Sequence, residues 1–303
     1  MTQPRHVLVT GAAGNIGSAI TRRLRASGSV VTAFGILESD ALTAERVIVG
    51  DATLEPDIAA ALDVSDTELP PIDAVVHMAA LPHPSAGTPY DVYRTNVVST
   101  FNVLAQAGAA GIRRAAIASS INAYGVPMNS HGPMPAYYPL DEQVPTDIDD
   151  WYSLSKASDE LTARMAWRRW GIDVVAFRFP FTAPADRLNG HVADNRDSPG
   201  DAVREGWSYL DVRDAARAVE LALTAPLSGA HALFVAAPET FRPEPTQDLL
   251  ERFAPDVTRL RAFIGREVPI DLTAAKTLLG FRAEHLLSGE APDVDTVAAG
   301  AAR

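Results

Sequence analysis

The chain has 303 residues, of which 47% are hydrophobic, and its formal net charge is −12 at pH 7. This length supports a substantial core without a covalent staple. The negative charge argues against nucleic acid or an anionic membrane as the main partner, because both need a concentrated basic face. The sequence contains no cysteine, which excludes disulfides, thiolate metal sites and cysteine nucleophiles and favours a reducing compartment.

The amino-terminal residues do not resemble a targeting sequence. Only a short apolar run follows His6, unlike the longer apolar core of a signal peptide. No later stretch reaches the roughly 20 apolar residues of a membrane span. We therefore expect a cytoplasmic protein with no membrane partner and no bound metal.

Short apolar runs alternate with segments of helical periodicity along most of the chain. Strands are predicted at residues 6–10, 30–34, 46–50, 74–78, 115–119, 174–179 and 232–236. Helices are predicted at residues 15–26, 56–62, 92–110, 155–170 and 212–223, with glycine stops at Gly28, Gly111 and Gly171. This alternation predicts an α/β fold, a Rossmann doubly wound parallel sheet with helices on both faces.

Two segments interrupt the alternation. Residues 180–206 are rich in Pro, Gly, Asp, Asn and Arg, and a proline-punctuated tail begins at Pro238. Both follow strands whose carboxyl ends form the ligand-binding edge of an open α/β sheet. We predict an NAD(P)-binding Rossmann domain of residues 1–179 and 207–237, and a small discontinuous C-terminal substrate-binding subdomain of residues 180–206 and 238–303.

A glycine-rich turn joins the first predicted strand to the first predicted helix. A tight turn favours glycine at position 11, close approach to a pyrophosphate favours it at 14, and helix packing favours it at 17. Free amides at the start of the helix suit phosphate. The alternative is an ordinary strand-to-helix turn that binds no ligand. Three glycines at these positions, directly after a strand and at the start of a helix, disfavour that alternative. The predicted dinucleotide contacts are Gly11, Ala13, Gly14, Asn15, Ile16 and Gly17.

The end of the second strand does not decide between NAD and NADP. Gly35 stands where an acidic residue usually binds the adenosine ribose, and no arginine beside it can hold a 2′-phosphate. Glu38, Ser39 and Arg46 are the candidates for the missing role. The expected cofactor is therefore NAD or NADP.

Further cofactor contacts are predicted after the third and fourth strands. Asp51, followed by Ala52, offers a carboxylate to the adenine amino group, and a helix cap is the alternative role of this carboxylate. Ala79 and Ala80 are small enough for the backbone to pass close to the cofactor, whereas His77 is expected to be structural.

Three side chains form the predicted catalytic group. Tyr152 and Lys156 are four residues apart on a helical segment and so share one face. An ammonium beside the phenol stabilises the phenolate, which suits acid–base work near neutrality, and Lys156 can also bind the nicotinamide ribose. Ser120 follows the fifth strand at the same sheet edge, where its hydroxyl can bond the substrate oxygen. An amphipathic helix with a solvated lysine, and a serine that caps a turn, are the alternatives.

The chain resembles the extended short-chain dehydrogenases/reductases of the NAD-dependent epimerase/dehydratase family. The matching segments are residues 10–17, 50–51, 77–80, 96–100, 119–120, 123–125, 152–156, 178–180 and 209–214. The resemblance implies a catalytic triad of Ser120, Tyr152 and Lys156, and places Asn96 on the helix that supports this site and the cofactor. It also implies a homodimer formed through the helices of Asn96 and Tyr152.

The resemblance leaves dehydrogenase, epimerase and dehydratase activities open. Ile121 and Asn122 stand where sugar 4,6-dehydratases carry an acidic pair, which disfavours dehydration. The segment 181–206 is short, which favours a smaller substrate than a nucleotide sugar. Residues 179–187 and 207–209 are similar to the uronate dehydrogenase branch, and this similarity implies that Arg187 binds a sugar carboxylate. A solvated loop charge is the alternative role of Arg187.

We therefore predict an oxidoreductase that moves hydride between NAD(P) and a hydroxyl-bearing carbon of a sugar or sugar acid. The predicted substrate contacts are Ser120, Arg187, His83 and Ser85. A nucleotide-sugar epimerase with tightly bound NAD is the first alternative. The second alternative is a regulator that binds NAD(P) without turnover, which has no need of the whole triad.

Overall fold

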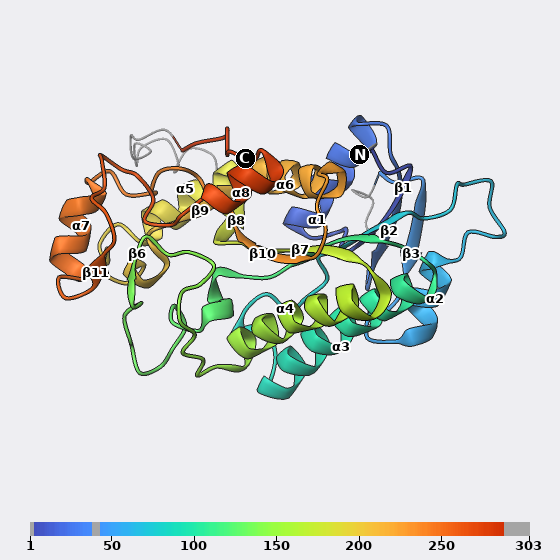
Figure 1. The fold of residues 1–303 in the computed structure, drawn as a ribbon, viewed down its shortest axis with the longest axis horizontal. Coiled ribbons are helices and arrows are strands. Elements are labelled where there is room, and N and C mark those ends of the chain that lie inside the picture. Colours follow the sequence, from blue (N-terminus) through green and yellow to red (C-terminus); the bar gives the residue numbers. More distant parts are fainter. Residues whose placement is uncertain (1–2, 38–42, 288–303) are drawn as a thin grey trace, which may run out of the picture.

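A seven-stranded parallel sheet forms the centre of the computed structural model, which describes residues 3–37 and 43–287 (Figure 1). The strands are β1 (His6–Thr10), β2 (Val30–Gly35), β3 (Arg46–Val49), β4 (Ala74–His77), β5 (Arg114–Ala118), β7 (Asp173–Arg178) and β10 (Ala230–Phe234). Their order in the sheet is β10-β7-β5-β4-β1-β2-β3. β2 and β3 thus lie on one side of β1, and β4, β5, β7 and β10 lie on the other, as in a doubly wound sheet. The predicted Rossmann fold is confirmed.

Helices cover both faces of this sheet (Figure 1). One face carries α2 (Glu55–Leu62), α3 (Pro89–Ala109) and α4 (Trp151–Trp170), and the other carries α1 (Asn15–Ala26), α6 (Val212–Thr224) and α8 (Thr273–Leu279). In the part of the chain that the structure describes, no helix is long and apolar enough to cross a membrane.

Capping side chains make two helices begin earlier than predicted. Asp150 Oδ1 accepts hydrogen bonds from the amides of Tyr152 and Ser153, both at 2.8 Å, so α4 begins at Trp151. Thr88 and Asp91 form a capping box at the start of α3. The cap on α4 places Tyr152 in the first helical turn, on the same helix as Lys156.

A smaller lobe lies beyond the carboxyl ends of β5, β7 and β10. It contains β6 (Tyr137–Tyr138), β8 (Phe181–Ala183), α5 (Ala185–Asp194), β9 (Tyr209–Asp211), α7 (Thr246–Phe253), β11 (Thr258–Arg259) and the short 3-10 helices η2 (Ile121–Tyr124) and η3 (Val203–Glu205). Its core includes the fully buried Tyr124, Tyr138 and Trp207. This core also draws on residues 121–144, whereas residues 275–283 pack on the Rossmann core. The exact domain division stays a prediction.

Residues 275–287 bring the chain from the small lobe back to the Rossmann domain. The buried carboxylate of Asp214 on α6 accepts hydrogen bonds from the amides of Glu284 and His285, at 3.0 and 2.7 Å. Tyr209 Oη accepts another from the Leu287 amide at 2.9 Å. These bonds fix residues 284–287 against α6 and β9.

Candidate active site

The turn between β1 and α1 requires glycine at two positions. Gly11 has a positive φ of 65°, and a Cβ there would lie 2.6 Å from the Ala79 amide nitrogen. A Cβ on Gly17 would lie 2.2 Å from the Gly11 carbonyl oxygen. The backbones of β1, β4 and α1 therefore meet more closely than any side chain permits. The N-cap Gly14 provides no side-chain cap, so the first amides of α1 stay available to an anion such as a pyrophosphate.

The predicted adenosine contacts have partners of their own in the structure. Asp51 Oδ1 accepts hydrogen bonds from Thr53 N and Oγ1, both at 2.8 Å, and its other oxygen has no hydrogen bond among the described residues. The Arg46 guanidinium donates to the carbonyls of Ala60 and Ala61 at the end of α2. Arg46 is therefore engaged away from the end of β2, while Glu38 and Ser39 lie outside the described residues.

The three predicted catalytic residues lie together at the end of β5. Lys156 Nζ donates to the carbonyl of Ala118 at 2.8 Å and lies 6.0 Å from the centroid of the Tyr152 ring. Ser120 comes two residues after Ala118, and Ser120, Tyr152 and Lys156 are each at most 6% exposed. Ser120 Oγ accepts hydrogen bonds from Asn122 N and Nδ2, at 3.1 and 3.2 Å. Its own O–H thus stays free to donate to a substrate oxygen.

Two polar residues of this site were not expected to act in it. Asp159 Oδ2 accepts a hydrogen bond from Lys156 Nζ at 3.1 Å, and its Oδ1 is buried without a partner. Asn122 Oδ1 is likewise buried without a partner, beside Ser120. The spacing of Lys156 and Asp159 on one helix was a usable signal. Nothing in the sequence indicated that Asn122 turns toward Ser120.

Asn96 connects the loop after β4 to the catalytic helix. Its side chain bonds both the amide and the carbonyl of Leu81, at 2.8 and 3.1 Å, and donates to Ser155 Oγ at 3.0 Å. These bonds use its donors and its acceptor within the protein. The structure therefore gives Asn96 a positioning role, and a direct cofactor contact by this residue stays a prediction.

The other predicted substrate residues, His83, Ser85 and Arg187, are exposed at the surface. His83 Nδ1 and Ser85 Oγ are 2.8 Å apart at the start of the 3-10 helix η1 (Pro84–Ala86). Trp151 Nε1 donates to the Pro84 carbonyl at 3.0 Å, which holds this loop against the start of α4. Arg187 is exposed on α5 and has no hydrogen bond or ion pair among the described residues. Their contact with a substrate stays a prediction.

His77 lies under the site as a buried neutral ring. Its Nδ1 is 2.7 Å from Thr10 Oγ1 and its Nε2 is 3.4 Å from Ser99 Oγ. Burial, and then the charge of Lys156, lowers the pKa of His77 to about 3. This environment fits the structural role that the sequence predicts for His77.

Acid is expected to destabilise the protein through His77. The unfolded chain binds a proton at this ring below the ordinary pKa of 6.5, whereas the folded chain binds it only near 3. The neutral His77 ring therefore makes its full contribution to the stability of the folded state above pH 6.5, and this contribution is lost as the pH falls toward 3. Between pH 7.5 and 5 the parent should lose about 2 kcal/mol more than His77→Gln in urea unfolding. Equal losses in the two proteins would contradict this assignment.

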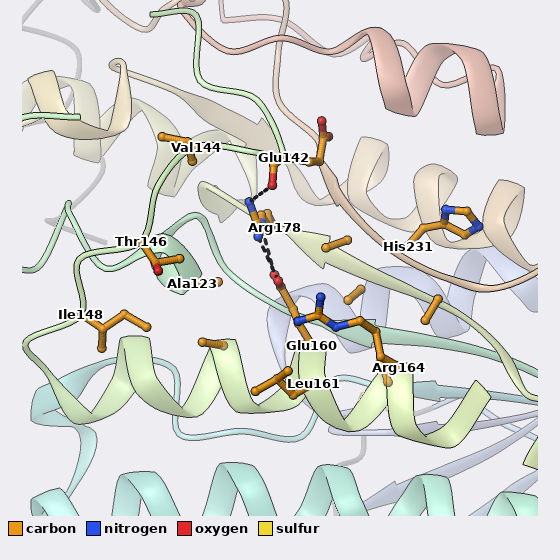
Figure 2. Close-up of a pocket in the computed structure, with 15 residues that line it drawn as sticks. Ala123, Glu142, Val144, Thr146, Ile148, Glu160, Leu161, Arg164, Arg178 and His231 are labelled. Atoms are coloured by element: carbon orange, nitrogen blue, oxygen red, sulfur yellow. Dashed lines mark hydrogen bonds and ion pairs between the residues drawn. The ribbon is translucent and has the colours of Figure 1, made fainter. Parts of the chain in front are cut away.

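Arg178 and Glu160 form a buried ion pair (Figure 2), which also bonds Ser119, the residue next to Ser120. Arg178 Nε and Nη2 donate to the two carboxylate oxygens of Glu160, at 2.8 and 2.9 Å, and Ser119 Oγ donates to Glu160 Oε1 at 2.7 Å. A cavity of about 490 Å³ opens beside the pair, between α4, β7 and β10. Most hydrogen-bonding groups of Arg178 and Glu160 have partners within the protein, so the ion pair stabilises the end of β5.

The comparison with protein families covers the Rossmann domain. Residues 7–237 match the NAD dependent epimerase/dehydratase family. The chain therefore belongs to this family, and it is an enzyme of the extended short-chain dehydrogenase type with NAD as its cofactor class.

Within residues 3–37 and 43–287, no group of three or more His, Asp or Glu side chains is arranged to hold a metal ion.

Several curated proteins are similar to the chain. L-arabinose 1-dehydrogenase (NAD(P)(+)) of Haloferax volcanii is 29% identical, over 66% of this chain and 76% of its own length. UDP-glucose 4-epimerase of Azospirillum brasilense is 31% identical, over 59% of this chain and 50% of its own length. Uronate dehydrogenase of Pseudomonas putida is 28% identical, over 59% and 61%. The chain thus matches only half to three quarters of the length of these relatives.

A solved structure shares the whole fold. A short-chain dehydrogenase/reductase superfamily protein from Agrobacterium tumefaciens, solved with bound NAD, has a TM-score of 0.70 and 21% identity, and the match covers 98% of both chains. This likeness extends the agreement in fold to the small lobe.

Proposed function

We propose that the protein is an NAD-dependent dehydrogenase that oxidises a hydroxyl-bearing carbon of a sugar or sugar acid. The observation that carries this proposal is the convergence of Ser120, Tyr152 and Lys156 at the end of β5. The glycine-rich turn after β1 lies at the same edge of the sheet, two strands away. At about 4.8 Å per strand, this separation suits one dinucleotide that lies across the edge.

The proposed reaction removes a proton and a hydride from the substrate. When bound, the oxidised nicotinamide supplies the hydride acceptor. Ser120 donates its O–H to the substrate oxygen and so orients the hydroxyl group. Tyr152, as phenolate, takes the hydroxyl proton while the carbon loses its hydride and becomes a carbonyl. The Lys156 ammonium stabilises the phenolate before this proton arrives.

The first experiment follows the near-ultraviolet absorbance of reduced nicotinamide. Purified protein is mixed with NAD or NADP and with uronic acids, free aldoses or UDP-sugars in turn. We expect net reduction with a uronic acid or a free aldose, and the faster cofactor then distinguishes NAD from NADP. Failure to reduce either cofactor with any of these sugars would overturn the proposal.

A nucleotide-sugar epimerase is the second candidate, because a UDP-glucose 4-epimerase is among the similar proteins. The same Ser120, Tyr152 and Lys156 would serve that reaction with a retained cofactor. Cofactor that copurifies, and a UDP-sugar that changes configuration by NMR without net reduction, would establish it instead.

Replacing Arg187 by Ala is expected to raise the KM for a uronic acid about tenfold or more. A guanidinium that binds a carboxylate in a two-pronged hydrogen bond contributes more than a solvated charge. The free aldose that lacks the carboxylate is the internal control, and its KM should stay near the parent value. An unchanged KM for every acidic substrate would remove Arg187 from the substrate site.

The exposed faces of α3 and α4 support the predicted homodimer. Large apolar side chains are exposed on both helices, which lie side by side (Figure 1): Tyr90, Val98, Phe101, Trp151, Leu154 and Leu161. Phe101 is 49% and Leu161 58% exposed. A shared apolar patch of this kind typically marks an interface, and we propose that a second copy of the chain covers it.

A double variant should separate the two copies. Phe101→Glu with Leu161→Glu places two charges on the proposed interface, so the mass by light scattering should fall from dimer to monomer. Ile264→Glu is the matched control, because Ile264 is 86% exposed and lies outside α3 and α4. A parent protein that is already monomeric, or a double variant that stays dimeric, would contradict this interface.

A further inference from the structure

Lys156 stands out among the basic residues of the chain. The sequence contains only two lysines, Lys156 and Lys276. Lys276 is exposed on α8, whereas Lys156 is 3% exposed. A buried ammonium loses its hydration and tends to release its proton unless other groups stabilise the charge. The surroundings of Lys156 must therefore supply that stabilisation.

Two groups of the protein bond the Lys156 ammonium. Its Nζ donates to the Ala118 carbonyl at 2.8 Å and to Asp159 Oδ2 at 3.1 Å. The side chains of Lys156 and Asp159 are 4% and 1% exposed. An ammonium has three N–H donors, so one stays unused by the described residues. Among these two partners, only Asp159 carries a negative charge.

The other groups around the pair do not replace this charge. Glu160 is held by Arg178 and Ser119, as described above. His77 is neutral, because its pKa lies at about 3. Burial raises the pKa of Asp159, while Lys156 and the Thr100 side chain on α3 act to lower it. Asp159 is thus the nearest counter-charge of Lys156.

The unpaired oxygen of Asp159 argues against a purely structural role. Its Oδ1 is buried and makes no hydrogen bond of normal geometry, although the Thr100 hydroxyl lies near enough to help lower the Asp159 pKa. A buried acceptor that is poorly satisfied costs free energy. An apolar residue at this position of α4 would avoid that cost. The benefit of the carboxylate must therefore lie in its action on Lys156.

We propose that Asp159 is a positioning residue for the catalytic lysine. It keeps Lys156 in the ammonium form and, with the Ala118 carbonyl, fixes two of the three N–H groups. The third N–H would then be available to the ribose of a bound dinucleotide, with the Tyr152 ring centroid 6.0 Å from Nζ. The catalytic meaning of this arrangement rests on the proposed function, but the effect on the charge of Lys156 does not.

The direct test is the titration of the two lysines by NMR, with lysine labelled with carbon-13 at Cε and neither cofactor nor substrate added. Because the chain has only two lysines, Lys276 serves as an internal reference. In Asp159→Asn, the Lys156 signal should titrate at a pH lower by about one unit or more than in the parent. Asp214→Asn is the matched control, because it also removes a buried carboxylate but lies on α6. Neither signal should move in that variant.

The second readout is the pH profile of kcat/KM. Asp159→Asn should acquire a falling limb on the alkaline side, with a loss of about tenfold for each pH unit above the new midpoint, because the uncharged lysine no longer supports Tyr152. A merely structural defect would lower the rate equally at every pH.

A milder variant covers the case in which Asp159→Asn does not fold. Thr100→Val has nearly the same shape and removes one group that favours the Asp159 carboxylate, so the Lys156 signal should move in the same direction by less. Unchanged titration of Lys156 in every folded variant would overturn the proposal. Failure of the dehydrogenase assay with a shifted Lys156 signal would overturn only the proposed function.

Discussion

Tyr152→Phe is expected to lower kcat by about 10³-fold, since a general acid or base contributes 10²–10⁴-fold to a reaction of this type. The substitution removes only the phenolic oxygen that takes the substrate proton. The ring stays in the first turn of α4, where the Asp150 cap bonds the backbone amide of residue 152. Cofactor binding should therefore remain close to that of the parent.

The measurement is steady-state turnover with the best substrate of the panel, together with NAD binding by fluorescence. Tyr93→Phe is the matched control, because it makes the same chemical change at a tyrosine of α3 that is 37% exposed. The control should keep the parent rate. A Tyr152→Phe enzyme with the parent kcat would rule out the proposed proton transfer.

Among the variants proposed, Arg178→Met should lose the most stability. We expect its free energy of unfolding to fall by about 3–5 kcal/mol, which is the range for breaking a buried ion pair. The side chains of Arg178 and Glu160 are 8% and 10% exposed. The variant leaves the Glu160 carboxylate without its partner, beside a cavity that Val144, Ile148 and Leu161 help to line (Figure 2). Ser119 then bonds a carboxylate that is no longer held in place, so the end of β5 should loosen as well.

Urea unfolding of three variants separates the charge effect from the loss of packing. Arg178→Met with Glu160→Gln removes the unpaired charge and keeps an oxygen for Ser119, so it should recover at least half of the loss. Arg261→Met breaks an exposed ion pair with Glu267 and should cost less than about 1 kcal/mol. A single Arg178→Met variant that is no less stable than Arg261→Met would contradict the role of the buried pair.

The periodicity of the sequence accounts for most of the fold. The bounds of β1 and α1 agree with the prediction because strand, glycine turn and helix follow one another directly there. The start of α4 was predicted at Ser155, which is too late. Asp150 fixes the true start through bonds to two amides, but Asp147 and Asp149 stand beside it, and the sequence does not show which of the three caps the helix.

The candidate site likewise contains residues that could be predicted from the sequence and residues that could not. Ser120, Tyr152 and Lys156 could be predicted, because strand ends and helical spacing place them at one edge of the sheet. The Glu160 partner of Ser119 could not be predicted, since a carboxylate in a helix reads as a solvated charge until the fold buries it. For Lys156 and Asp159, the i, i+3 spacing was a usable signal of the pair but gave no sign of its burial. The role of Asn96 depends likewise on a tertiary contact with Leu81 and Ser155.

The packing of α8 and residues 281–287 against the Rossmann domain also constrains the order in which the core forms. Ala275 and Leu279 of α8, followed by Phe281, complete the hydrophobic cluster that contains Val7 and Val9 of β1. The core around β1 therefore closes only after residues 275–281 have been synthesised and have packed against it. Until then the Rossmann domain exposes an unfinished apolar surface, and such a surface favours aggregation.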